Sequence, residues 1–127
     1  MLNILLAGKN PQGLSALAAS LNKEDGIRLM TATSAQEAWG ILGNCRMDVV
    51  VMDEHLADGD SLAFVKELVK QQPLINCAMV SSLAAKDFHE ATEGLGVFMQ
   101  LPVNPEAEEA ARMLQLLQSI GALMAKP

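Results

Sequence analysis

The chain has 127 residues, of which 50% are apolar, 9 are basic and 15 are acidic, giving a net charge of −6. This length and composition predict one globular domain, residues 1–127, with a single core. The acidic balance and the lack of any Lys or Arg cluster argue against nucleic acid and membrane surfaces as partners. With no membrane-length apolar run and no metal-ligand spacing around its two cysteines, we expect a cytoplasmic protein with free thiols and no zinc.

Short apolar runs alternate with helical patterns along the whole chain. Strands are predicted at residues 4–7, 27–31, 47–52, 74–80 and 96–100. Helices are predicted at residues 10–21, 34–42, 60–71, 84–93 and 104–124. Asn10-Pro11 and Asn104-Pro105 each pair a capping residue with a proline at the first helical position, and Ser34 to Glu37 has the spacing of a capping box.

This order predicts an α/β fold, a doubly wound five-stranded parallel sheet of the (βα)5 type with helices on both faces. In such sheets the functional site lies at the carboxyl edge of the strands, near the point where the strand order reverses. Asp53 closes the run Asp-Val-Val-Val-Met-Asp at residues 48–53 and is therefore expected at that edge. We interpret Asp53 as the main candidate for a functional side chain.

Several landmarks together resemble the response-regulator receiver domain of two-component signalling, over nearly the whole chain. The segment 48–53 resembles the strand bearing the phosphoacceptor, 56–61 the loop that follows it, and 94–102 the fifth-strand signature. The resemblance implies a flavodoxin-like receiver fold and makes Asp53 the candidate phosphoacceptor. It also implies that Ser81 and Phe98 are the switch residues and that a histidine kinase or a downstream signalling protein is the partner.

The sequence departs from the family pattern at the residues that would surround a phosphoryl group. The family's acidic pair maps to Gly8 and Lys9, and its lysine maps to Leu101. Magnesium requires oxygen ligands, so the resemblance with these losses implies no metal and no cofactor. We expect Lys9 to form an ion pair with Asp53. The expected function is that of an atypical stand-alone receiver domain, not an enzyme, acting as a phosphorylation-independent protein-interaction module.

Two alternatives stay open. In the first, Asn10 with Asp58 or Glu54 rebuilds a weakened site for Mg²⁺, and Asp53 is a working phosphoacceptor. In the second, the chain is a cobalamin-type small-ligand module. Segments 53–55, 81–83 and 94–96 superficially resemble the motifs of cobalamin-binding domains, although the spacing between them differs.

The last predicted helix has an apolar face that covers about half of its circumference, wider than the roughly 100° that one packed face requires. Part of this face should remain exposed after folding, next to the fifth strand. We therefore expect a protein partner or a homodimer to bind the last helix and fifth strand. The residues expected on this partner surface are Met113, Leu116, Ile120 and Leu123.

Overall fold

Five short strands form one parallel sheet in the computed structural model, which describes residues 2–119 except for the side chain of Pro11. The strands are β1 (Leu2–Ala7), β2 (Ile27–Ala32), β3 (Val49–Met52), β6 (Asn76–Val80) and β7 (Val97–Leu101), in the spatial order β2-β1-β3-β6-β7. Each neighbouring pair runs parallel. The predicted fold class is confirmed. Because β2 and β3 lie on opposite sides of β1, the strand order reverses between β1 and β3.

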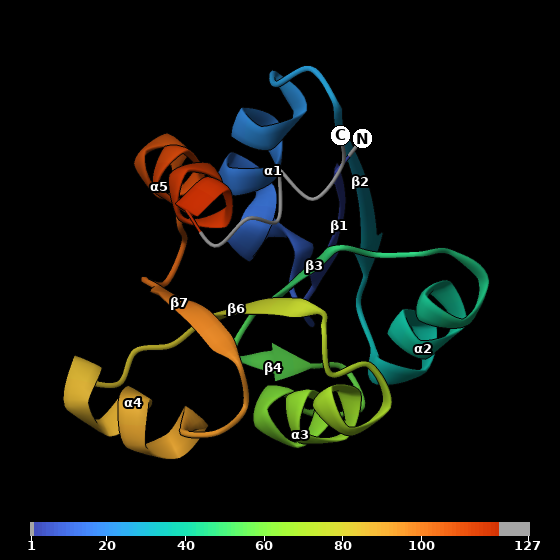
Figure 1. The fold of residues 1–127 in the computed structure, drawn as a ribbon, viewed down its shortest axis with the longest axis vertical. Helices are drawn as coiled ribbons and strands as arrows, with labels where there is room; N and C mark the ends of the chain where they lie inside the picture. The colour runs from blue at the N-terminus through green and yellow to red at the C-terminus, as the bar shows by residue number, and fades with distance from the viewer. Residues whose placement is uncertain (1, 120–127) are drawn as a thin grey trace.

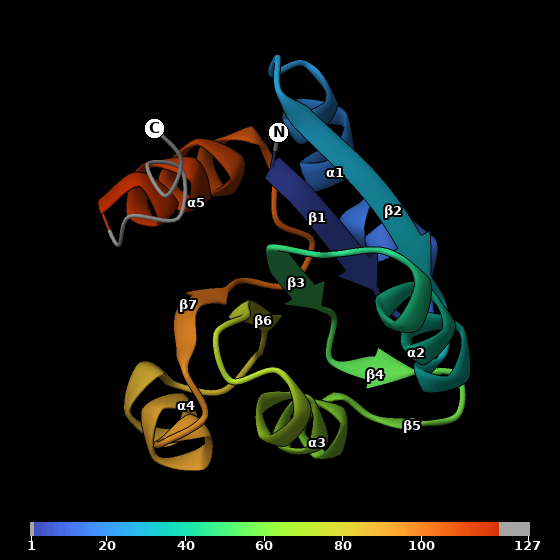
Figure 2. The ribbon, with the colours of Figure 1, turned by 45° about the vertical axis from the view of Figure 1, so that its right-hand side comes forward.

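Helices cover both faces of this sheet (Figures 1 and 2). One face is covered by α1 (Ser15–Asn22) and α5 (Ala107–Ser119), and the other by α2 (Ala35–Asn44), α3 (Ser61–Gln71) and α4 (Ala85–Thr92). Each face has its own buried apolar cluster.

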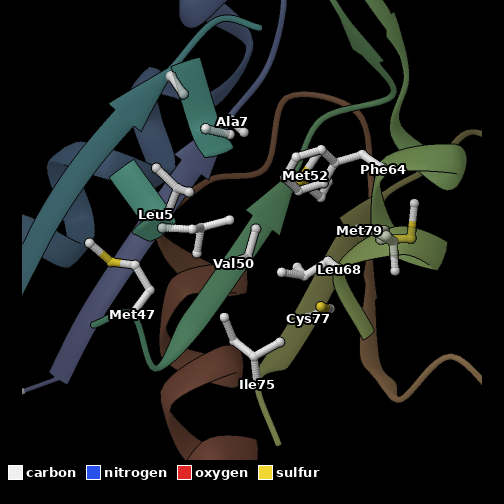
Figure 3. Close-up of a cluster of buried hydrophobic side chains, with 14 of the residues drawn as sticks. Leu5, Ala7, Met47, Val50, Met52, Phe64, Leu68, Ile75, Cys77 and Met79 are labelled. Carbon is white, nitrogen blue, oxygen red and sulfur yellow. The ribbon is translucent and has the colours of Figure 1, made fainter. Parts of the chain in front are cut away.

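The two clusters follow from side-chain alternation along the strands. In β3, Val49 and Val51 join the cluster under α1 and α5, whereas Val50 and Met52 join the cluster under α2, α3 and α4. Figure 3 shows the second cluster, in which Val50 and Met52 lie with residues of α3 such as Leu68. All four β3 residues are buried, as expected for a central strand covered on both faces.

Two predicted helix starts are confirmed by their caps. The Asn10 side chain accepts a hydrogen bond from the Gln12 N–H (3.2 Å) at the start of a short 3₁₀ helix, η1 (Pro11–Leu14), which leads into α1. Ser34 Oγ accepts from the Glu37 N–H (3.0 Å) at the start of α2. The Glu37 carboxylate accepts from the N–H of Thr33 (2.7 Å), one residue before the cap.

Two predicted boundaries are wrong. Leu74, predicted within the fourth strand, is 93% exposed and precedes β6, because Pro73 and Leu74 lie in the turn that Ile75 closes on Gln72. Asn104 does not cap the last helix. Its φ of 58° places it in the left-handed region, which Asn tolerates in turns, and α5 begins only at Ala107.

One further element was not predicted. Strands β4 (His55–Leu56) and β5 (Gly59–Asp60) pair as a small antiparallel hairpin directly after Asp53. Cys45 and Cys77 are both free, as expected. Within residues 2–119, no helix has the length and apolarity needed to cross a membrane.

Candidate functional site

Asp53 directly follows β3, at the carboxyl edge of the sheet and beside the point of strand reversal. Its backbone is held from two sides: the N–H donates to the carbonyl of Ala7 (2.8 Å), and the hydroxyl of Ser61 donates to its carbonyl. Ser61, the first residue of α3, is almost fully buried. The position predicted for Asp53 is confirmed, and its backbone is fixed by the two elements that flank it.

The Asp53 side chain is half-buried and lies against the backbone of the segment that follows β1. A Cβ atom at Gly8 would be only 2.6 Å from Asp53 Cβ, and one at Gly13 would be 2.8 Å from Asp53 Oδ2. Asp53 Oδ1 accepts a hydrogen bond from the Glu54 N–H (2.8 Å). With Asp53 in this position, Gly8 has no room for any side chain.

The expected ion pair between Lys9 and Asp53 is wrong: within residues 2–119 Lys9 forms no ion pair, and its side chain is exposed. The Lys9 N–H donates to the carbonyl of His55 (2.7 Å), which fixes the backbone. It is the neighbouring residue, Gly8, that lies against Asp53.

Ser81, at the predicted switch position, directly follows β6, and its N–H donates to the carbonyl of Leu101 (3.0 Å). Its hydroxyl accepts from the Leu83 N–H (3.1 Å) and so closes a turn within its own loop. The next residue, Ser82, donates to Glu54 Oε2 through both its N–H (2.8 Å) and its hydroxyl (2.9 Å). The loop after β6 is therefore tied to the loop after Asp53 by a carboxylate.

Gln100 holds the same loop from the other side. Its side-chain amide donates to the carbonyls of Ser81 (3.2 Å) and Leu83 (2.9 Å). Ser61 and Gln100 were not recognised from the sequence as parts of the site, and Glu54 was considered only as a possible ligand of a weakened Mg²⁺ site. A weak signal existed for Gln100, the only polar residue in the apolar strand β7.

Leu101, which the resemblance maps to the family's lysine, is fully buried in the cluster under α1 and α5. It serves as a core residue. Phe98, the predicted aromatic switch residue, is half-buried and lies at an irregularity of the sheet. Cys77 pairs with Val97 and Ala78 with Met99, so Phe98 is the extra residue of a β-bulge.

The groups that could have rebuilt a magnesium site have other partners. Asn10 caps η1, and Glu54 accepts from Ser82. The carboxylate of Asp58 accepts from the N–H groups of Ala35 (2.6 Å) and Gln36 (3.1 Å), at the start of α2. The Ala35 hydrogen bond, with that from Gln36, lowers the pKa of Asp58. In the described part of the chain, no three His, Cys, Asp or Glu side chains are grouped so that they could hold a metal ion.

The partner surface expected on the last helix is only partly supported. Met113 lies on the face of α5 that packs on the sheet and is fully buried there, so its assignment to the partner surface is wrong. Leu116 is half-buried and packs at the margin of the same cluster. Ile120 and Leu123 lie outside the described residues.

The fold and the site define a class: a doubly wound α/β domain with a carboxylate at the carboxyl edge of its central strand. Residues 4–117 match the family model described as the response regulator receiver domain. The chain belongs to this family. It matches no curated protein sequence.

Solved structures with the same fold include a two-component response regulator from Clostridium difficile, 17% identical over 94% of this chain and 98% of that one, with a TM-score of 0.81. The chemotaxis response regulator CheY4 of Vibrio cholerae is 19% identical over 91% of this chain and 97% of its own, with a TM-score of 0.78. The receiver domain of the Francisella response regulator 1452 is 20% identical over 94% and 99%, with a TM-score of 0.80. At these identities the likeness concerns the fold alone.

Proposed function

We propose that this receiver domain is atypical and works as a protein-interaction module of two-component or phosphorelay signalling without being phosphorylated. The observation that carries the proposal is the close packing of Asp53 against Gly8, where the family pattern has a carboxylate. In this proposal the domain is not an enzyme. The loop after β6, residues 81–84, carries Ser81 and is called the switch loop below. In this proposal it is held by Glu54 and Gln100 instead of by a bound phosphoryl group.

The chemistry of the available ligands supports this proposal. Phosphoryl transfer to a carboxylate depends on charge stabilisation, for which magnesium is bound through oxygen ligands. Around Asp53, Gly8 provides no side-chain oxygen, Lys9 is a cation, and Glu54 and Asp58 already accept hydrogen bonds elsewhere. These residues do not fit a magnesium site, and Leu101 provides no positive charge for a phosphoryl group.

The partner in this proposal is a protein, either a histidine kinase, a downstream signalling protein or a second copy of the chain. The surface is formed by α5 and β7, where Leu114, Leu116 and Phe98 are half-buried beside the core cluster. Apolar side chains left partly exposed on neighbouring elements are typical of contact surfaces. Leu116→Glu should abolish partner binding, whereas Gln118→Glu, an exposed position on the same helix, adds the same charge and should not.

The deciding experiment is an amide-shift NMR titration with magnesium and then with beryllofluoride, a mimic of the acyl phosphate. We expect no shifts at Asp53, Ser81 or Phe98 at either step. Shifts that begin at Asp53 and extend to Phe98 would contradict the proposal, because they would mean that the site accepts a phosphoryl group and transmits its arrival. A control receiver domain with its acidic pair intact should respond under the same conditions.

A second candidate function is favoured by one observation. In the described residues, Asp53 Oδ2 accepts no hydrogen bond, so one oxygen of the candidate phosphoacceptor stays free at the carboxyl edge. In this alternative Asp53 is phosphorylated in a weakened Mg²⁺ site. Incubation with a small phosphodonor and magnesium would then leave acid-stable, base-labile phosphate on the protein, and Asp53→Asn would remove it.

A further inference from the structure

A cavity of about 400 Å³ opens between α3 and α4, beneath the loop after β6. This volume lies within the roughly 300–1,000 Å³ range of small-molecule sites. Much of its wall is apolar and comes from β6, the loop after it, α3 and α4. The apolar lining residues are Leu62, Met79, Val80, Leu83, Phe88 and Ala91. Leu83 is 49% exposed, so part of this apolar wall is open to solvent.

The polar side of the cavity carries negative charge. Glu54, His55 and Asp60 line it, and among its described lining residues there is no Lys or Arg. Each carboxylate uses one oxygen within the protein: Glu54 Oε2 accepts from Ser82, and Asp60 Oδ2 accepts from the N–H of Ala63 (3.1 Å). The other oxygens, Glu54 Oε1 and Asp60 Oδ1, accept no hydrogen bond from residues 2–119. Two carboxylate oxygens are therefore available to a ligand.

We propose that this cavity is a binding site for a small apolar molecule that carries one cationic group, such as an amine. The apolar wall favours removing hydrocarbon surface from water. A cation at the mouth would be attracted by Glu54 and Asp60 and could donate to their free oxygens. An anionic ligand of the same shape would be repelled by the same two carboxylates.

The cavity is linked to the switch loop through Glu54. The same carboxylate that faces the cavity also accepts both hydrogen bonds from Ser82. Ser81, Ser82 and Leu83 line the cavity, so a bound ligand would contact the loop directly. Ligand binding would thus be sensed at this loop independently of any chemistry at Asp53, whose side chain does not line the cavity.

The test is an amide-shift NMR titration with three matched probes: 2-phenylethylamine, 2-phenylethanol and 3-phenylpropionate. The amine should give saturable shifts at Ser82, Leu83 and Ala91. It should bind up to about fivefold more tightly than the alcohol, as expected for a solvent-accessible ion pair of at most about 1 kcal/mol. The carboxylate should bind weakest. Equal binding of amine and carboxylate, or shifts that lie elsewhere, would overturn the proposal.

Variants locate the site. Glu54→Gln keeps a hydrogen-bond acceptor for Ser82 but removes one of the two charges, so the preference for the amine over the alcohol should fall; Glu54→Gln combined with Asp60→Asn should remove that preference. Glu108→Gln, which removes an equal charge from the first turn of α5, should leave binding unchanged. Ala91→Trp should fill the cavity and abolish binding of all three probes. Since Ala91 is exposed, the Ala91→Trp protein should fold. If it does not fold, the charge variants at the mouth of the cavity still test the proposal.

Discussion

The two sides of Asp53 are built differently. On the side of β1, Asp53 packs against two residues without side chains, Gly8 and Gly13. On the side of β6, the loop after this strand is held by the side chains of Glu54 and Gln100. The first region depends on close contact, and at Gly8 the nearest atom is Asp53 Cβ, which cannot rotate away. The second depends on hydrogen bonds between partly exposed groups. The comparison teaches that the two regions should respond differently to mutation: the glycine side should reject added atoms, and the loop side should accept substitutions that keep an acceptor or donor.

The largest loss of stability is expected for Gly8→Val. Its Cβ would lie 2.6 Å from Asp53 Cβ, an atom next to the backbone that cannot rotate away. We expect the free energy of unfolding, measured with urea, to fall by about 1–3 kcal/mol, as for overpacked cores. Gly40→Ala is the control, because nothing lies near its Cβ in α2, and it should be stabilising by about 0.5–1 kcal/mol.

A double-mutant cycle with Asp53→Gly shows whether this cost comes from Asp53 itself. Removing Asp53 Cβ removes the nearest atom, so much of the cost of Gly8→Val should disappear in the double variant. Residues in contact typically show coupling of about 0.5–3 kcal/mol. If the losses of unfolding free energy in the two single variants simply add in the double variant, the cost of Gly8→Val does not come from contact with Asp53, and the contrast between the two sides of Asp53 is wrong.

Gly13→Ala should have a smaller effect on the same side. The new methyl group would lie 2.8 Å from Asp53 Oδ2, the far end of a side chain that can rotate. The expected loss of unfolding free energy is about 0.5–1.5 kcal/mol, the cost of moving a side chain away from its preferred rotamer. A cost equal to that of Gly8→Val would show that the carboxylate cannot adjust.

On the loop side, Glu54→Ala removes the acceptor of two hydrogen bonds from Ser82. The expected loss is about 0.5–1 kcal/mol, because the groups are partly exposed and water replaces the carboxylate. Hydrogen exchange at the Ser82 amide should become faster. Glu54→Gln keeps an acceptor and should be close to neutral, in contrast to any substitution at Gly8.

The sequence predicted where the site lies in the fold better than it predicted the contacts between its side chains. The apolar run before Asp53 was enough to place it at the carboxyl edge, because a buried parallel strand must end there. The predicted ion pair between Lys9 and Asp53 was wrong because charge complementarity alone was considered, whereas the Lys9 side chain is exposed to solvent. The helix cap predicted at Asn104 was wrong because Asn is favoured both at helix caps and in left-handed turns. The contact between Glu54 and Ser82 joins residues 28 positions apart, and no local pattern marks such a pair.

The smallest effect is expected at Asp58, which ties the loop after Asp53 to the start of α2. Hydrogen bonds from Ala35 and Gln36 lower its pKa in the folded protein, so its ionised form stabilises the fold. This contribution is complete above the ordinary pKa of an aspartate and is lost as the pH falls through the lowered value. Asp58→Asn should therefore be less stable at pH 7, and its unfolding free energy should depend less on pH between about 5 and 3. Parallel curves for the two proteins in urea titrations over this range would mean that this hydrogen-bonded tie does not persist in solution, and that the loop is held mainly on its Glu54 side.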